Sequence, residues 1–146
     1  MIGVVIAAML QATVPFATVA QGVDSRIVTA REVVIRSAGE WQALWSEHSL
    51  QASPVVDFSD SIVVGVFLGS RPTAGYRVEF VTIKVEGNQA VVEYTERRPA
   101  QGGLVAQVLT SPFHLVRLPR SVGSVQFKNV EPPANSTPPA IKRDVR

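Results

Sequence analysis

An uninterrupted apolar run, Ile62-Val63-Val64-Gly65-Val66-Phe67-Leu68, constrains the fold of this chain more than any other feature of its sequence. Successive side chains of a strand point to opposite faces, so a strand that is apolar at every position needs a cover on both sides. The run therefore predicts a central strand that lies between two packed layers.

Downstream of this strand, the stretches 76–86 and 90–97 flank Gly87-Asn88, a two-residue hairpin signal. Pairing Glu86 with Gln89 places three apolar pairs on one face: Val85 with Ala90, Ile83 with Val92, and Val81 with Tyr94. Before this point the apolar positions are even-numbered instead of odd-numbered. We therefore predict a bulge near Phe80-Val81.

One helix is predicted upstream, where Ser37 and Glu40 form a capping box. An apolar stripe follows at helical spacing: Trp41, Leu44, Trp45 and His48. Two tryptophans on one helix could form a platform for a sugar or an aromatic ligand, but we interpret them as anchors that attach the helix to a sheet.

Further strands are predicted around 27–35, 113–118 and 124–128, with turn signals about every ten residues. The fold class is therefore mainly β (α+β): an antiparallel sheet or sandwich of about five to seven strands with one packed N-terminal α-helix. We expect this domain to span residues 33–130, after an N-terminal segment at 21–32.

The two ends of the chain differ from this domain. Residues 1–23 carry no charged side chain, Ile2 to Leu10 are apolar, and Thr18-Val19-Ala20 offers small residues before Gln21. This pattern predicts a signal peptide at 1–20 and an exported protein, periplasmic or extracellular, with no stable membrane insertion after cleavage. A retained anchor and a buried strand are the alternatives. The proline-rich residues 131–146 predict a disordered tail.

Composition and motifs argue against most catalytic chemistry. The chain has no cysteine, its net charge is +2 without a basic stripe, and His48 and His114 lie in no hydrolase signature. We therefore expect no enzyme activity, no cofactor, no metal site and no nucleic-acid partner. The glutamates Glu79, Glu93 and Glu96 follow the alternation that is typical of a solvent-exposed face.

The most informative segment is the connection that follows the central strand. Its candidate partner-binding residues are Arg71, Pro72, Thr73, Ala74, Gly75 and Tyr76. Pro72 restricts φ and Gly75 permits a positive φ, so the segment is stiff before it binds anything. A plain tight turn is the alternative interpretation. The side chains of Arg71 and Thr73 are expected to face solvent.

Two motifs in this order resemble a known family. Residues 69–78, Gly-Ser-Arg-Pro-Thr-Ala-Gly-Tyr-Arg-Val, and residues 109–116, Leu-Thr-Ser-Pro-Phe-His-Leu-Val, resemble the C-terminal domain of the protease complex subunit PrcB. Gly39-Glu40-Trp41 also looks like that family's opening helix, whereas Ala74 stands where the family more often has a second glycine. The resemblance implies an exported, non-catalytic subunit that associates with a secreted or envelope peptidase and supports its maturation or stability.

A shorter likeness involves the same turn. Residues 71–76 are similar to the Asn-Pro-Thr-Thr-Gly-Tyr/Phe loop of chagasin-type inhibitors of cysteine peptidases. This likeness implies a peptidase inhibitor as an alternative function. An orphan structural domain of the cell envelope is a third interpretation.

Overall fold

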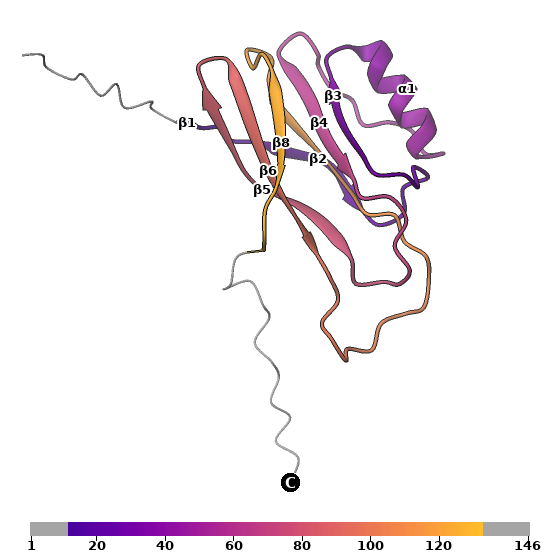
Figure 1. The fold of residues 1–146 in the computed structure, drawn as a ribbon. Coiled ribbons are helices and arrows are strands. Elements are labelled where there is room, and N and C mark those ends of the chain that lie inside the picture. The colour runs from indigo at the N-terminus through magenta and orange to yellow at the C-terminus, as the bar shows by residue number, and fades with distance from the viewer. Residues whose placement is uncertain (1–11, 133–146) are drawn as a thin grey trace, which may run out of the picture.

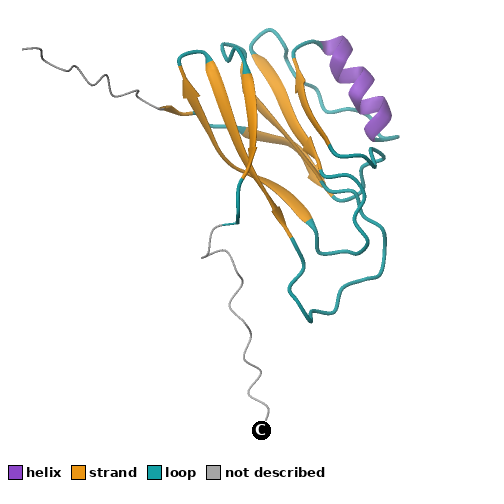
Figure 2. Cartoon of the chain, in the orientation of Figure 1, coloured by secondary structure: helices purple, strands orange, loops and turns teal. Residues whose placement is uncertain are grey.

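Two sheets of four strands pack face to face, and one helix covers the outer face of one of them (Figures 1 and 2). This computed structural model describes residues 12–132. The first sheet has the order β1-β5-β6-β8, with β1 Ala12–Thr13, β5 Arg77–Glu86, β6 Gln89–Arg97 and β8 Val125–Asn129. The second sheet has the order β2-β7-β4-β3, with β2 Ala17–Gly22, β7 Phe113–Pro119, β4 Ser61–Phe67 and β3 Arg31–Ile35. The predicted mainly β fold is confirmed, with eight strands in the described part of the chain.

The apolar run forms β4, and every residue of this strand is buried. Ile62, Val64 and Val66 face the core between the two sheets. Val63 and Phe67 point to the other side, into a second core beneath the helix. The predicted central strand with a cover on both faces is confirmed. The opposite sheet covers one face of β4 and the helix covers the other, so neither face is exposed to solvent.

The helix α1, Ala38–His48, begins and packs as the sequence predicts. Ser37 is the N-cap, and its hydroxyl accepts a hydrogen bond from the Glu40 N–H. Trp41 and Trp45 are buried, and their indole N–H groups donate to the backbone carbonyls of Pro54 and Gln51. Both tryptophans therefore anchor the helix to the sheet and do not form a ligand platform.

The hairpin of β5 and β6 confirms the predicted register from Glu86–Gln89 to Ile83–Val92. The predicted bulge is also present, because the pairing shifts between Phe80 and Thr82. The third predicted pair is wrong, however: Tyr94 lies opposite Phe80 instead of Val81. The bulge adds a residue to β5 alone, so every position before it is displaced by one relative to β6.

The last strand corrects the expectation of a purely antiparallel arrangement, because β8 runs parallel to β6. The chain leaves β7 in one sheet and enters β8 in the other, so β8 is not the hairpin partner of the strand before it. Backbone and side-chain hydrogen bonds hold this crossing: Gly123 N–H donates to Asn88 O, and Arg36 Nη1 donates to Val122 O.

The N-terminal residues also differ from expectation. β1 pairs with β5 and β2 pairs with β7, so residues 12–22 run along one edge of each sheet. The domain therefore begins well before residue 33, and the 21–32 segment is not a separate unit. The predicted cleavage after Ala20 stays a prediction, and it would remove β1 and most of β2. The apolar lead at 2–10 and the tail from 133 lie outside the described residues. Between residues 12 and 132, no helix has the length and apolar character needed to cross a membrane.

Candidate functional site

The turn that follows β4 lies at one end of the sandwich, beside the long connection from β6 to β7 (Figure 1). Four hydrogen bonds join the two segments. Arg71 and Thr110 exchange backbone hydrogen bonds of 2.7 and 3.0 Å, and Ala74 N–H donates to Ala106 O at 3.0 Å. The Thr110 hydroxyl donates to Thr73 O at 2.9 Å. The stiffness predicted for residues 71–76 therefore comes from a neighbouring segment as well as from the turn itself.

Gly75 has the predicted positive φ, at 94°. A Cβ atom at this position would lie 2.8 Å from Pro99 Cβ and 3.3 Å from Val105 Cγ1. Glycine is thus required twice, by the backbone conformation and by the close approach of the neighbouring segment. Pro72 is exposed, and Tyr76 is half-buried.

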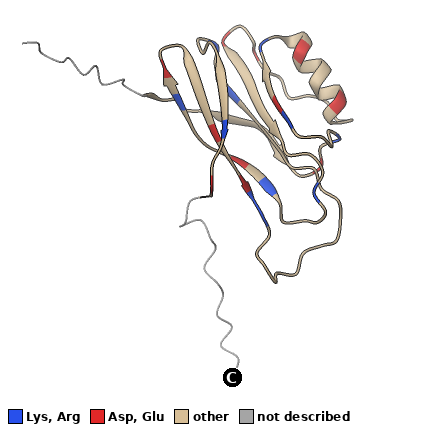
Figure 3. Cartoon of the chain, viewed as in Figure 1, with Lys and Arg blue, Asp and Glu red and all other residues tan. Residues whose placement is uncertain are grey.

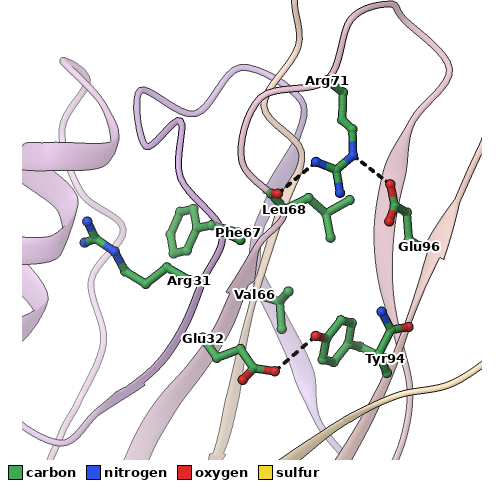
Figure 4. A pocket seen from close by; sticks show the side chains of 10 residues that line it. Arg31, Glu32, Val66, Phe67, Leu68, Arg71, Tyr94 and Glu96 are labelled. Carbon is green, nitrogen blue, oxygen red and sulfur yellow. Dashed lines mark hydrogen bonds and ion pairs between the residues drawn. The ribbon is translucent and has the colours of Figure 1, made fainter.

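Arg71 does not face solvent, which corrects the expectation. Its Nε donates to Glu96 Oε1 at 2.7 Å, and its Nη1 donates to Leu68 O at 3.0 Å (Figure 4). The hydrogen bond to Glu96 raises the pKa of the Arg71 guanidinium. Thr73 is half-buried too, and its hydroxyl donates to Ala74 O at 2.9 Å. Both side chains stabilise the turn because they donate hydrogen bonds to its backbone carbonyl groups.

A groove of about 270 Å³ opens beside this turn, between the two sheets (Figure 4). Val66 and Leu68 lie between two polar bridges. One bridge is the Arg71–Glu96 pair, and the other is a hydrogen bond of 3.0 Å from the Tyr94 hydroxyl to Glu32. Burial, supported by this hydrogen bond, raises the pKa of Tyr94 to about 12. Tyr94 is therefore neutral over the physiological pH range and cross-links the two sheets as a donor.

The three strand glutamates are not on a solvent-exposed face, contrary to expectation. The side chain of Glu96 is 13% exposed and that of Glu93 is 17% exposed. Glu79 is paired with Arg77 and, at 2.6 Å, with Arg97. The alternation of polar and apolar residues predicted solvent exposure because it depends only on residue polarity. In the fold, arginine and lysine side chains cover these carboxylates and neutralise their charge. Each is already paired with a cation, so none resembles a free catalytic base.

A buried hydroxyl–imidazole pair that the sequence did not reveal joins Ser25 to His48. Ser25 Oγ lies 2.8 Å from His48 Nδ1 and accepts a hydrogen bond from Ile27 N–H. The imidazole packs edge-on against Trp45 and Phe113. Burial lowers the pKa of His48, and the charge of Asp24 opposes this effect. Both polar residues are buried, and aromatic rings enclose the imidazole, so the pair has no open side for a substrate.

His114 forms a second such pair, with Thr18. The Phe80 N–H donates to His114 Nδ1 at 3.2 Å, so in the neutral ring Nε2 carries the proton. Nε2 then donates to Thr18 Oγ1, 2.9 Å away. Burial lowers the pKa of His114 to about 4. No sequence signal could reveal this pair, because 96 positions separate its members. Both histidines thus form hydrogen bonds with hydroxyl groups of residues that precede β3.

The described residues contain no group of three or more histidine, aspartate or glutamate side chains that could hold a metal ion.

Comparison with known families finds a match in the central part of the chain. Residues 62–119 match the family model described as PrcB C-terminal. This segment is similar to the PrcB C-terminal family. The match begins in β4 and ends at the last residue of β7, so it contains both sequence motifs and the turn with its neighbouring segment.

The match leaves β1, β2, β3, α1 and β8 outside, so the likeness of 39–41 to the family's opening helix stays a prediction. The likeness of residues 71–76 to a chagasin-type loop also stays a prediction. No curated protein and no solved structure matches the chain.

Proposed function

We propose that the protein is an exported, non-catalytic subunit that binds and stabilises a secreted or envelope peptidase through the loop end of its sandwich. The loop-end surface consists of the turn at 71–76 and the segment at 99–110 that is hydrogen-bonded to it. The observation that carries the proposal is the combination of ordered backbone and exposed aliphatic side chains in this segment.

The segment from 99 to 110 contains no charged residue, and it appears uniformly tan in Figure 3. Leu104 and Leu109 are 105% and 80% exposed, and Val108 is 53% exposed. Long connections without regular structure are uncommon in small domains and are usually functional. Clustered exposed aliphatic side chains commonly mark surfaces that bind another protein.

The hydrogen bonds between the turn and this segment also favour binding. A loop that is ordered before it meets a partner loses little conformational entropy in the complex. Arg71, Thr73 and Gly75 hold the backbone of the turn in place. Pro72, Leu104 and Leu109 offer exposed apolar surface.

The chemistry of the described residues supports a non-catalytic role. Each glutamate beside the groove is paired, and each histidine is enclosed. The peptidase is proposed as partner because the PrcB C-terminal domain relates the chain to protease complexes. Export is proposed from the uncharged apolar lead at residues 2–10.

The test is co-purification of a peptidase with the tagged full chain from the envelope and secreted fractions of its own host. We expect the peptidase, identified by mass spectrometry and by its activity, to be enriched with the unsubstituted chain. The double variant Leu104→Ser/Leu109→Ser should reduce its recovery at least tenfold, by analogy with the loss of central anchors in other interfaces.

Leu50→Ser is the matched control, because Leu50 is 87% exposed but follows α1, outside the loop-end surface. Equal losses from both variants, or recovery without any peptidase, would contradict the proposal, and the second result would favour an orphan structural domain. A peptidase whose activity falls at an equimolar ratio would favour the inhibitor alternative.

A further inference from the structure

Residues 12–22 occupy a strand position that the rest of the fold leaves open. We propose that the edge of β7 opposite β4, with the core beneath it, is a strand-binding site whose permanent occupant is residues 12–22 of the same chain. The working protein therefore keeps this segment, and the small residues Thr18-Val19-Ala20 are used as a strand and not as a cleavage site. The inference does not rest on the proposed function, and it is compatible with export because the apolar lead at 2–10 precedes the segment.

The backbone pairing supplies the first argument. β2 pairs with β7 from Ala17–Arg117 to Gly22–Phe113, and Val14 N–H donates to Ile83 O in the other sheet. Removal of the segment would leave β7 as a new edge of its sheet. β7 is buried at five of its seven positions, and a long apolar edge with unpaired N–H and C=O groups is a site of aggregation.

The apolar side chains of the segment enter both cores. Val14 and Phe16 pack against the core between the sheets, and Phe16 meets Phe80 edge-on at 6.2 Å. Val19 and Ala20 pack against the core beneath the helix. The register shift between Thr18 and Ala20 makes this possible, because a bulge lets two successive residues turn to the same side.

The polar side chains of the segment match specific buried partners. Thr18 Oγ1 accepts a hydrogen bond from His114 Nε2, and Gln21 Nε2 donates to Val78 O at 3.0 Å. Without Thr18, the buried His114 N–H would lose its acceptor, which costs free energy. Gly22 is fitted as well, because a Cβ atom there would lie 3.1 Å from the Phe113 ring. A leader that is cut away and degraded has no need of such a match.

The first test is the intact mass of the protein isolated from its own host. We expect a mature chain that includes residues 12–22. A mature chain that begins at Gln21 would overturn the inference. This result is independent of any peptidase partner, so it is distinguishable from failure of the proposed function.

The second test uses the folded full chain with a specific protease site inserted between Gly22 and Val23. After cutting, we expect the N-terminal fragment to stay bound and to co-elute with the remainder. Thr18→Val removes the acceptor of His114 while it keeps the shape of the side chain, and Phe16→Ala removes the ring against Phe80. Each should speed fragment release at least tenfold.

Ala17→Ser, at an exposed position of the same strand, is the control and should leave release unchanged. Immediate release of the unsubstituted fragment from a remainder that keeps its melting temperature would overturn the inference.

Discussion

Arg71 and Glu96 join the turn after β4 to the end of β6 through a hydrogen bond of 2.7 Å between Nε and Oε1. Their side chains are 27% and 13% exposed, so the pair lies at the edge of the groove and not in bulk solvent. The turn that the sequence marked as a contact loop is therefore also tied into the fold.

Arg71→Ala should destabilise the protein by about 1–2 kcal/mol, because the Glu96 carboxylate then loses its charged donor in a mostly covered position. Urea unfolding of the full chain measures this loss. Arg31→Ala provides the comparison, since the Arg31–Glu47 pair is 38% and 57% exposed and should cost no more than about 0.5 kcal/mol. Equal losses for the two variants would show that burial does not strengthen the Arg71–Glu96 pair.

Gly75→Ala should cost more stability than Gly87→Ala, although both glycines have a positive φ. Both replacements strain the backbone by about 1 kcal/mol or more. The alanine Cβ at 75 would also meet Pro99, whereas nothing lies within 4 Å of the corresponding atom at 87. Thermal unfolding of the two variants tests this order. If the two melting temperatures fell equally, the close approach of the 99–110 segment would be unimportant.

The unfolding free energy should fall as the pH is lowered from about 6.5 towards 4, in part because of His114. Its pKa is lowered to about 4 in the fold, so in this window the unfolded chain binds a proton that the native chain does not. This pKa difference contributes at most about 3 kcal/mol to the unfolding free energy. The contribution is fully present above pH 6.5 and is lost near pH 4.

His114→Gln separates this effect from the titration of carboxylates and of His48, whose pKa burial also lowers. Urea unfolding at a series of pH values should give a shallower dependence for this variant than for the unsubstituted chain. Parallel curves for the two proteins would mean that His114 is protonated equally easily in both states.

Thr95→Val should stabilise the protein by about 1 kcal/mol. Thr95 is fully buried in β6, and its hydroxyl has no hydrogen-bond partner. Valine has nearly the same shape without the desolvated polar group, so the melting temperature should rise. Thr29→Val, at an exposed position, should leave it nearly unchanged. A loss of stability in Thr95→Val would indicate that the hydroxyl is satisfied in solution.

Much of the local structure follows from the sequence because short-range patterns decide it. The cap at Ser37, the stripe of Trp41, Leu44 and Trp45, and the hairpin around Gly87 depend on residues within a few positions of one another. The turn at 71–76 is also decided locally, because the glycine at position 75 predicts a positive φ without reference to distant residues. Whether the Arg71 side chain faces solvent could not be predicted from local sequence, because its partner Glu96 lies in the distant strand β6.

The sequence by itself determined a central strand covered on two sides, one capped helix and a hairpin with a bulge, because hydrophobic period and turn chemistry act locally. Only the tertiary structure decided that residues 12–22 close the sandwich, that β8 runs parallel to β6, and that both histidines form hydrogen bonds with hydroxyl groups of residues that precede β3. Thr18 and His114 illustrate the reason. Their bond depends on where two distant strands meet, and neither residue carries a pattern that identifies the other.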